Sequence, residues 1–322
     1  MKFHHALMAV ALAAGATMAT ADTYPTKPIT LVVGFPPGGG ADGVARQISE
    51  ALGRQLRQTV VMDYRPGAGT TIASGYVAKA AADGYTLYMT SGSHYGADKV
   101  LYKKNVHYEG KDFAPIARWT RTPLILAVST ASGIGSVQDL VARAKAKPGE
   151  LTYASSGSGV APHLAAVLFE SAAGIKMTHV PFKGGAPAVN AVASGDVQLT
   201  FGTPPSIIPL AQAGRVKMIA VTSQERSQSF PDLPTIAESG YKGFDYTFWF
   251  GLYGPAGLHK DIANKLADAS AKVLADKGLQ GRLAAGGNVA APTASVAEFT
   301  SWAEAEGQRM KALMQQSGAS VD

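Results

Sequence analysis

The stretch from residue 29 to residue 46 constrains the fold of this 322-residue chain more than any other. Residues 29–33 form an apolar, largely β-branched run, which predicts a strand. Residues 36–40 are too rich in proline and glycine for a regular element, and Asp42 is a favoured N-cap, so we expect a helix to begin there. A glycine turn ahead of a helix presents backbone N–H groups at the positive end of the helix dipole. The stretch therefore predicts an anion-binding loop at Gly38, Gly39 and Gly40.

Three later loops repeat this order of strand, glycine- or serine-rich loop and helix, at residues 67–70, 155–159 and 202–206. Alternating strands and helices with short links predict an α/β fold, with mainly parallel sheets flanked by helices. Ligands bind such sheets outside the carboxyl ends of the strands, where these loops lie. Each loop alone is equally consistent with an ordinary strand-to-helix turn. Loops on two facing lobes, however, would hold a carboxylate from both sides without a buried cation.

The alternation falls into two units, with a break near residue 122. From about residue 260 the chain is helical, with Ile262 and Leu266 on one face, and shows no strand alternation of its own. A helical segment without a sheet has to pack on one of the two units, and the simplest arrangement returns it to the first. We therefore predict a first lobe of residues 22–121 plus 250–322 and a second lobe of residues 122–249. The chain then crosses between the lobes twice.

The first 21 residues have the pattern of a secretory signal peptide. Lys2 gives a basic start, residues 6–16 are apolar and small, and Ala19-Thr20-Ala21 matches a small-x-small cleavage site. The apolar run is too short and too rich in alanine for a stable membrane span. We predict cleavage after Ala21 and a mature protein that is soluble outside the cytoplasmic membrane. An uncleaved anchor is the alternative.

Residue types that catalysis or metal binding requires are absent from the sequence or lack the usual spacing. The chain has no cysteine, and none of the five histidines after residue 21 has a metal-binding pair spacing. Neither the nucleotide P-loop pattern nor the hydrolase pattern Gly-x-Ser-x-Gly occurs. The net charge of +6 is modest, and no basic run interleaved with aromatic residues indicates a nucleic-acid surface. We predict a binding protein with no cofactor, metal or nucleic-acid partner; an exported hydrolase using a serine-rich loop is the alternative.

Short motifs along nearly the whole chain after residue 21 resemble one protein family. They include Phe35-Pro36-Pro37-Gly38-Gly39-Gly40-Ala41-Asp42, Arg65-Pro66-Gly67-Ala68-Gly69, Asp83-Gly84-Tyr85-Thr86-Leu87, Pro181-Phe182-Lys183-Gly184-Gly185 and Trp249-Phe250-Gly251-Leu252. In this order they are similar to the Bug-type (TctC-like) solute-binding proteins of tripartite tricarboxylate transporters. The resemblance implies a periplasmic, two-lobed "Venus flytrap" of the type II binding-protein fold. Such a protein closes on a small carboxylate and delivers it to membrane permease subunits.

We expect a monomer. A ligand-sensing module for a membrane signalling partner needs the same closure and remains an alternative.

The resemblance also assigns ligand contacts to the Pro-Gly-Gly loop of the first lobe, to the Ser/Gly loop of the second lobe and to the Pro-Phe-Lys-Gly stretch. With neighbouring loop residues added, the predicted binding residues are Phe35, Pro37, Gly38, Gly39, Gly40, Asp42, Ser91, His94, Ser155, Ser156, Gly157, Ser158, Gly159, Phe182, Lys183 and Thr203.

The sequence departs from the family pattern where the ligand is expected. Residues 201–206 read Phe-Gly-Thr-Pro-Pro-Ser, so an acid and an amide of the usual Asp-Asn-Leu-Pro-Ser are missing. Without the acid, an ammonium group would lack its partner, which argues against an amino-acid ligand. His94 is either a ligand donor or a surface residue, and the aromatic residues Phe35, Tyr95, Phe182 and Phe250 either line an apolar midsection or pack in the core. We predict a dicarboxylate with a bulky or aromatic centre, such as terephthalate.

Overall fold

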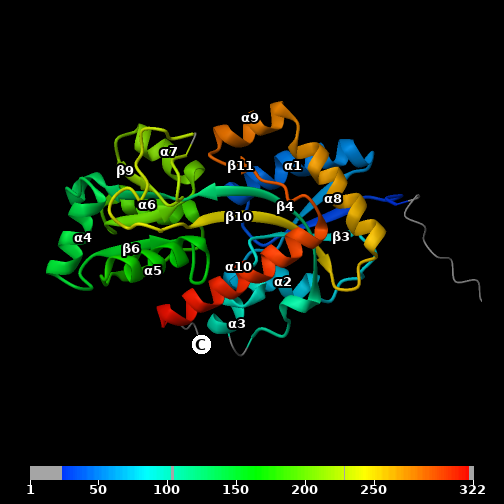
Figure 1. Ribbon diagram of the computed structural model, residues 1–322, viewed down its shortest axis with the longest axis horizontal. Coiled ribbons are helices and arrows are strands. Elements are labelled where there is room, and N and C mark those ends of the chain that lie inside the picture. Colours follow the sequence, from blue (N-terminus) through cyan, green and yellow to red (C-terminus); the bar gives the residue numbers. More distant parts are fainter. Residues whose placement is uncertain (1–23, 103–104, 228, 319–322) are drawn as a thin grey trace, which may run out of the picture.

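The computed structural model describes residues 24–102, 105–227 and 229–318, so the predicted signal peptide and its cleavage site lie outside the described residues. Two lobes lie side by side, each built on one β-sheet with helices packed on it (Figure 1). The two-lobed α/β fold predicted from the sequence is confirmed.

The first lobe is organised around a six-stranded sheet with the strand order β11-β4-β10-β3-β1-β2. Its strands are β1 (Ile29–Val33), β2 (Val60–Tyr64), β3 (Thr86–Thr90), β4 (Phe113–Pro123), β10 (Thr247–Pro255) and β11 (Val289–Ala290). Strand β1 pairs in parallel with β2 and β3, whereas β10 is antiparallel to β3 and β4. The short strand β11, antiparallel to β4, corrects the expectation that the C-terminal part has no strand.

The second lobe contains a five-stranded sheet with the strand order β7-β6-β8-β5-β9. Its strands are β5 (Ile125–Ser129), β6 (Thr152–Ser155), β7 (Thr178–Pro181), β8 (Leu199–Gly202) and β9 (Val216–Val221). Strand β6 is parallel to β7 and β8, but β5 is antiparallel to β8 and β9. Both sheets are thus mixed instead of mainly parallel. The antiparallel strands lie next to the crossings between the lobes, where the chain does not return through a helix.

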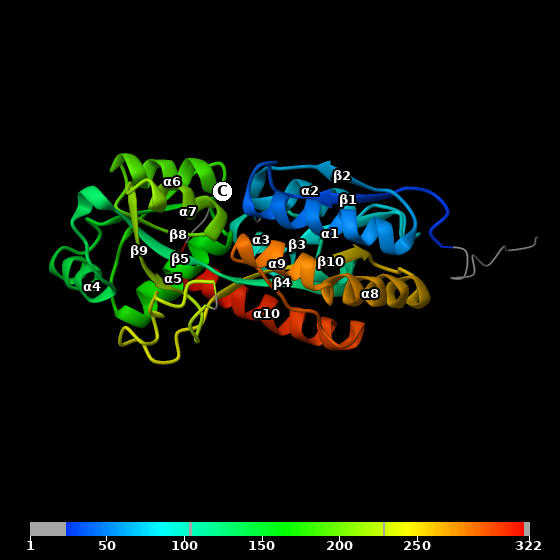
Figure 2. The same ribbon diagram turned by 90° about the horizontal axis from the view of Figure 1, so that it is seen from above.

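Helices cover both sheets, and the view from above separates those of the two lobes (Figure 2). The first lobe carries α1 (Gly40–Leu56), α2 (Thr71–Val77), α3 (Ala97–Leu101), α8 (Lys260–Leu274), α9 (Lys277–Ala285) and α10 (Val296–Ser317). The second carries α4 (Val137–Ala146), α5 (Ala161–Ala173), α6 (Gly185–Ser194) and α7 (Pro204–Gln212). Single 3₁₀ turns are η1 (Ala68–Thr70), η2 (Ser93–Tyr95), η3 (Gly110–Asp112) and η4 (Thr130–Ser132). Within the described ranges, no helix combines the length and apolarity that a membrane span needs.

Helix α10 connects the two lobes. It packs on β4 and α8 of the first lobe and also on α5 of the second. In both overall views its C-terminal end reaches toward the second lobe (Figures 1 and 2). The C-terminal segment therefore contacts both lobes.

Helix α1 buries one stripe of apolar side chains, as its spacing of four residues predicts. Val44, Ile48 and Leu52 are almost completely buried. The helix begins at Gly40, which corrects the predicted start at Asp42. Asp42 lies in the first turn, and its carboxylate accepts a hydrogen bond from the Gly38 N–H at 2.8 Å. The side chain thus folds back and fastens the preceding glycine loop.

The two chain crossings between the lobes are hydrogen-bonded to each other. Strand β4 passes into β5 through Leu124, and the chain returns from β9 to β10. The hydroxyl of Thr222, a fully buried residue after β9, accepts from the Leu124 N–H at 2.8 Å and donates to the Tyr246 carbonyl at 2.6 Å. The backbone adds two further hydrogen bonds: the Thr222 N–H donates to the Leu124 carbonyl at 3.0 Å, and the Tyr246 N–H donates to the Thr222 carbonyl at 2.8 Å. Thr222 therefore joins both crossings.

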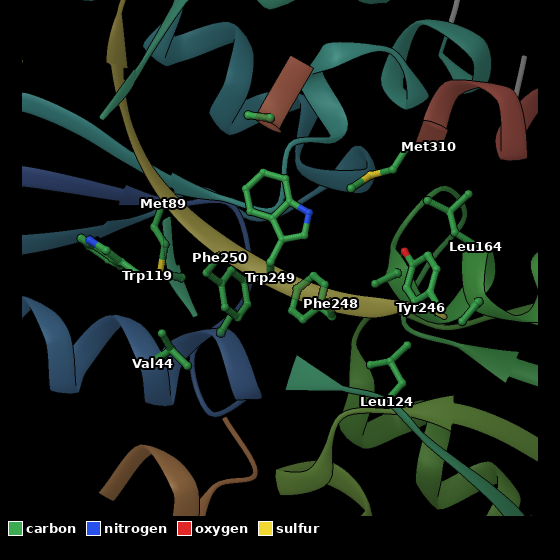
Figure 3. Close-up of a cluster of buried hydrophobic side chains, with 14 of the residues drawn as sticks. Val44, Met89, Trp119, Leu124, Leu164, Tyr246, Phe248, Trp249, Phe250 and Met310 are labelled. Carbon is green, nitrogen blue, oxygen red and sulfur yellow. The ribbon is translucent and has the colours of Figure 1, made fainter. Parts of the chain in front are cut away.

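Strand β10 directs aromatic side chains to both faces of the first sheet, because side chains alternate along a strand. Trp249 packs against Trp302 of α10, with ring centroids 4.9 Å apart. Phe248 and Phe250 share the other face, with centroids 4.5 Å apart. Figure 3 shows these three consecutive side chains on β10 within the buried cluster. One strand thus supplies both the hydrophobic core and a wall of the cleft.

Candidate functional site

A cavity of about 680 Å³ lies between the lobes, within the range of about 300–1,000 Å³ that is typical of small-molecule sites. Its walls are the segments that follow β1, β2, β6, β7 and β8, together with β10. The cavity therefore lies at the carboxyl ends of the parallel-paired strands, where such sheets bind ligands.

The middle of the cavity wall is largely apolar. Phe35 meets Phe250 edge-to-face, with ring centroids 6.0 Å apart, and Phe248 continues this surface. Phe182, Val160 and Val189 line the cavity from the second lobe. Of the described residues that line it, Lys183 alone carries a charged side chain. A ligand with an apolar centre fits this wall better than a ligand that is polar throughout.

Four helices begin at the cavity, and within the described part of the chain no side chain caps any of them. They are α1, α5, α6 and α7, whose N-cap residues Gly39, Val160, Gly184 and Thr203 all line the cavity. The other helices of eight or more residues begin elsewhere and are capped by the side chains of Ser136, His259, Asp276 and Ser295. The first N–H groups of a helix have no intrahelical partner. At the start of α1, the N–H groups of Gly40, Ala41 and Asp42 are therefore available to an anionic ligand. In α5 and α7 the N–H groups of His163 and Ser206 already bond to the carbonyls of Val160 and Thr203.

The helix starts differ in what they offer. Helix α1 begins Gly40-Ala41-Asp42 and has an N–H at each position. Helix α7 begins with Pro204 and Pro205, which have no N–H. Its contribution comes from the hydroxyls of Thr203 and Ser206, which are 3.1 Å apart and both belong to cavity-lining residues. The first lobe thus offers backbone donors, and the start of α7 offers side-chain donors.

Asp42 stabilises the glycine loop from behind and does not line the cavity. Its carboxylate accepts hydrogen bonds from the Gly38 N–H and the Tyr64 hydroxyl, and Arg46 lies 2.9 Å away. Burial acts to raise the pKa of Asp42, but the bonds from Tyr64, Gly38 and Arg46 outweigh it and hold the pKa below its usual value. Asp42 is therefore ionised at neutral pH and positions the loop.

His94 lies away from the cavity, in an aromatic cluster of the first lobe. The η2 turn directs its ring inward, where it is 2 % exposed. Its centroid is 4.3 Å from that of Phe113, 4.5 Å from Tyr95 and 4.9 Å from Tyr253. Burial lowers the pKa of His94 to about 3, so the ring is neutral. The sequence predicted that His94 is either a ligand donor or a surface residue. The polar loop around it gave no sign that its ring would turn into the core.

The other predicted residues divide between the wall and its surroundings. The structure brings Phe35, Gly39, Gly40, Ser156, Gly157, Phe182, Lys183 and Thr203 together around the cavity. Pro37, Gly38, Ser91, Ser158 and Gly159 are not among its lining residues, and Ser155 is buried behind the second-lobe loop.

Further lining residues were missing from the prediction. Gly67 and Thr70 belong to the second of the repeated glycine loops and Pro66 directly precedes it, so the sequence held a signal for them. Tyr102 and Phe248 also line the cavity, but they come from the end of α3 and from the returning strand β10. Only the tertiary fold brings these two residues to the cleft.

Comparisons with known proteins agree with this geometry. Residues 44–319 match the family model described as "Tripartite tricarboxylate transporter family receptor". Rpa4515 of R. palustris, solved with adipate, is 33% identical, with a TM-score of 0.86 over 92% of this chain and 100% of that one. The periplasmic binding protein BugD is 30% identical, with a TM-score of 0.79 over 92% and 100%. MatC of Rhodopseudomonas palustris, solved with malate, is 28% identical, with a TM-score of 0.81 over 90% and 100%.

Proposed function

The chain belongs to the tripartite tricarboxylate transporter receptor family, and from this premise we propose that it is a periplasmic solute-binding protein that captures a dicarboxylate. The observation that carries the proposal is the set of four helices that begin at the cavity without a side-chain cap from any described residue. The start of α1 is a site for a carboxylate because its N–H groups and its dipole both favour negative charge. The start of α7 would act through its dipole and the hydroxyls of Thr203 and Ser206 instead, because Pro204 and Pro205 have no N–H.

The helix starts come from both lobes, which supports a ligand with a carboxylate at each end. Helix α1 belongs to the first lobe, and α5, α6 and α7 belong to the second. A monocarboxylate would satisfy one set of N–H groups and leave the other without a charged partner. A dicarboxylate satisfies both and bridges the lobes.

The aromatic wall between the helix starts supports a bulky or aromatic ligand centre, such as that of terephthalate. Phe35, Phe182 and Phe250 all line the cavity and would contact a flat ring. Adipate, bound to Rpa4515, has an apolar centre of four methylene groups, whereas malate, bound to MatC, has a short polar one. The apolar wall of this chain suits the first kind of centre better.

Ligand binding drives lobe closure in this proposal. We take residues 22–121 plus 250–322 as the first lobe and residues 122–249 as the second, hinged at the two crossings that Thr222 joins. A ligand held by both lobes binds the closed form better than the open one and shifts the population toward it. Permease subunits of a tripartite tricarboxylate transporter would then receive the ligand from the closed, monomeric receptor.

A hydrolytic function is less well supported. The Ser155 hydroxyl lies 2.6 Å from Nε2 of His179, a distance suited to a nucleophile and its base. However, Ser155 is fully buried and does not line the cavity. The serine of this loop that lines the cavity is Ser156, so turnover of an ester panel that is lost in Ser156→Ala would favour the hydrolase instead of the receptor.

Calorimetry with terephthalate, adipate and succinate tests the ligand class. We expect terephthalate or adipate to bind more tightly than succinate. Tight binding of succinate with no response to terephthalate would refute the bulky-centre proposal.

Deletion of the gene separates transport from sensing. We expect uptake of the bound diacid to be lost, whereas lost signalling with intact uptake would favour the sensor.

A further inference from the structure

Two histidine rings are stacked behind the second-lobe loop at residues 155–159. His163 lies in the first turn of α5, and His179 lies on β7. Their ring centroids are 4.0 Å apart and their planes differ by 4°. Tyr153 of β6 stacks on His179, at 4.9 Å. Neither histidine lines the cavity, and the proposed function assigns no role to either of them.

Each histidine contacts one end of the loop. The N–H of Gly159 donates to Nδ1 of His163 at 3.0 Å. The hydroxyl of Ser155 lies 2.6 Å from Nε2 of His179, and it also contacts the Gly157 carbonyl at 2.8 Å. The two loop residues between these ends that line the cavity are Ser156 and Gly157. The histidines thus hold the loop at both ends, on either side of the part that faces the ligand.

The geometry fixes the protonation of His163. Its Nδ1 accepts from a backbone N–H, so this nitrogen carries no proton and the proton of the neutral ring is on Nε2. Burial, with a smaller contribution from His179, lowers the pKa of His163 to about 3, and burial lowers the pKa of His179 to about 4. Tyr153 on β6 stacks on His179, and Glu170 on α5 acts electrostatically on Tyr153. Two charged rings stacked this closely would repel each other.

We propose that neutral His163 and His179 are positioning residues that hold the second-lobe loop in the conformation that presents Ser156 and Gly157 to the ligand. The effect on ligand affinity rests on the proposed function, whereas the effect on loop conformation does not. Each ring acts through one nitrogen: Nδ1 of His163 and Nε2 of His179.

The different ring nitrogens allow a crossed substitution test. An asparagine oxygen lies where Nδ1 of histidine lies, and a glutamine amide group reaches the position of Nε2. His163→Asn and His179→Gln therefore keep the hydrogen bonds, whereas His163→Gln and His179→Asn remove them. Circular dichroism identifies variants that fail to fold, and these are left out of the comparison.

The first readout is the amide NMR signal of Gly159 in the ligand-free protein. We expect it to be close to the wild-type position in His163→Asn and to shift in His163→Gln. In the wild-type protein it should move together with the ring nitrogens of His163 as the pH is lowered below 5. A Gly159 amide signal that is unchanged both by the substitutions and by the pH titration would overturn the proposal.

The second readout is the affinity for adipate, measured by calorimetry. We expect His163→Asn and His179→Gln to bind within about threefold of the wild type, and the other two variants about tenfold more weakly. Equal losses in all four variants would mean that ring packing matters and hydrogen bonding does not, which would also overturn the proposal. If the wild type itself binds no adipate, the proposal that the protein binds such a diacid fails. The Gly159 signal then still tests the role of the two histidines.

Discussion

Gly40 of the first lobe faces Thr203 of the second: a Cβ atom on Gly40 would lie 3.2 Å from the Thr203 hydroxyl oxygen. Both residues line the cavity, so the lobes meet at its edge. Gly184 of the second lobe also faces the first, and a Cβ there would make an ordinary contact of 3.8 Å with the ring of Pro36. The tight approach is at Gly40, where the absence of a side chain lets the two lobes come close.

Gly40→Ala should lower the affinity for adipate about fivefold, because the added methyl group opposes closure onto Thr203 at a cost of about 1 kcal/mol. Calorimetry measures this change. Thr203→Ala removes the obstructing hydroxyl, so the double variant should bind no worse than Thr203→Ala alone. Additive losses in the double variant would show that the two residues do not meet during binding.

Gly39→Val should abolish binding while leaving the fold intact. Gly39 has a backbone φ of −93°, which valine accepts, and a Cβ there meets nothing closer than the Pro36 carbonyl at 3.9 Å. The side chain would instead cover the N–H groups at the start of α1. The control is Gly43→Val, at an exposed position on the same helix with no atom near its Cβ. Retained affinity in Gly39→Val would remove the glycine loop from the site.

Thr222→Val should lower the free energy of unfolding by about 2 kcal/mol, because it leaves the Leu124 N–H and the Tyr246 carbonyl without the hydroxyl partner. Thr222→Ser keeps the hydroxyl and loses one buried methyl group, at a cost of about 1 kcal/mol. Urea denaturation compares the variants. If the valine variant is the more stable of the two, the hydroxyl does not hold the crossings together.

Stability should fall as the pH is lowered from about 6.5 to about 4, in part because of the stacked histidines. Their pKa values are lowered in the folded protein, to about 3 for His163 and about 4 for His179. Between these values and the unfolded value near 6.5, the unfolded chain binds more protons, and each histidine contributes at most about 1.4 kcal/mol per pH unit. Urea denaturation at pH 7, 6 and 5 should show a shallower decline in the double variant His163→Asn, His179→Gln. An unchanged decline would contradict neutral burial of the pair.

Local patterns in the sequence predicted most of the strand-loop-helix units. Residues 29–33 are apolar and β-branched, and a glycine turn follows, so β1 and the start of α1 are visible without tertiary information. Strand β10 was not predicted. It contains Gly251 and Gly254, is buried almost throughout, and pairs with β4 across more than 100 residues of chain, so no local alternation marks it.

In the candidate site too, local sequence predicts some residues, and only the tertiary fold reveals the others. Gly39, Ser156 and Thr203 lie in loops whose composition indicates a helix start, and all three line the cavity. His94 also lies in such a loop, but its ring turns into the aromatic cluster. Side-chain direction after a strand depends on the packing around it, which sequence composition does not encode. Phe248 reaches the cavity from β10, far from these loops in the chain.

The most direct test of the central claim compares adipate with hexanoate, which has the same chain length and one carboxylate fewer, by calorimetry on the mature protein. If helix starts from both lobes each hold one carboxylate, adipate should bind with one-to-one stoichiometry and about 100-fold more tightly than hexanoate. Equal affinity for the two acids would contradict the account, because only one end of the cavity would then bind a carboxylate.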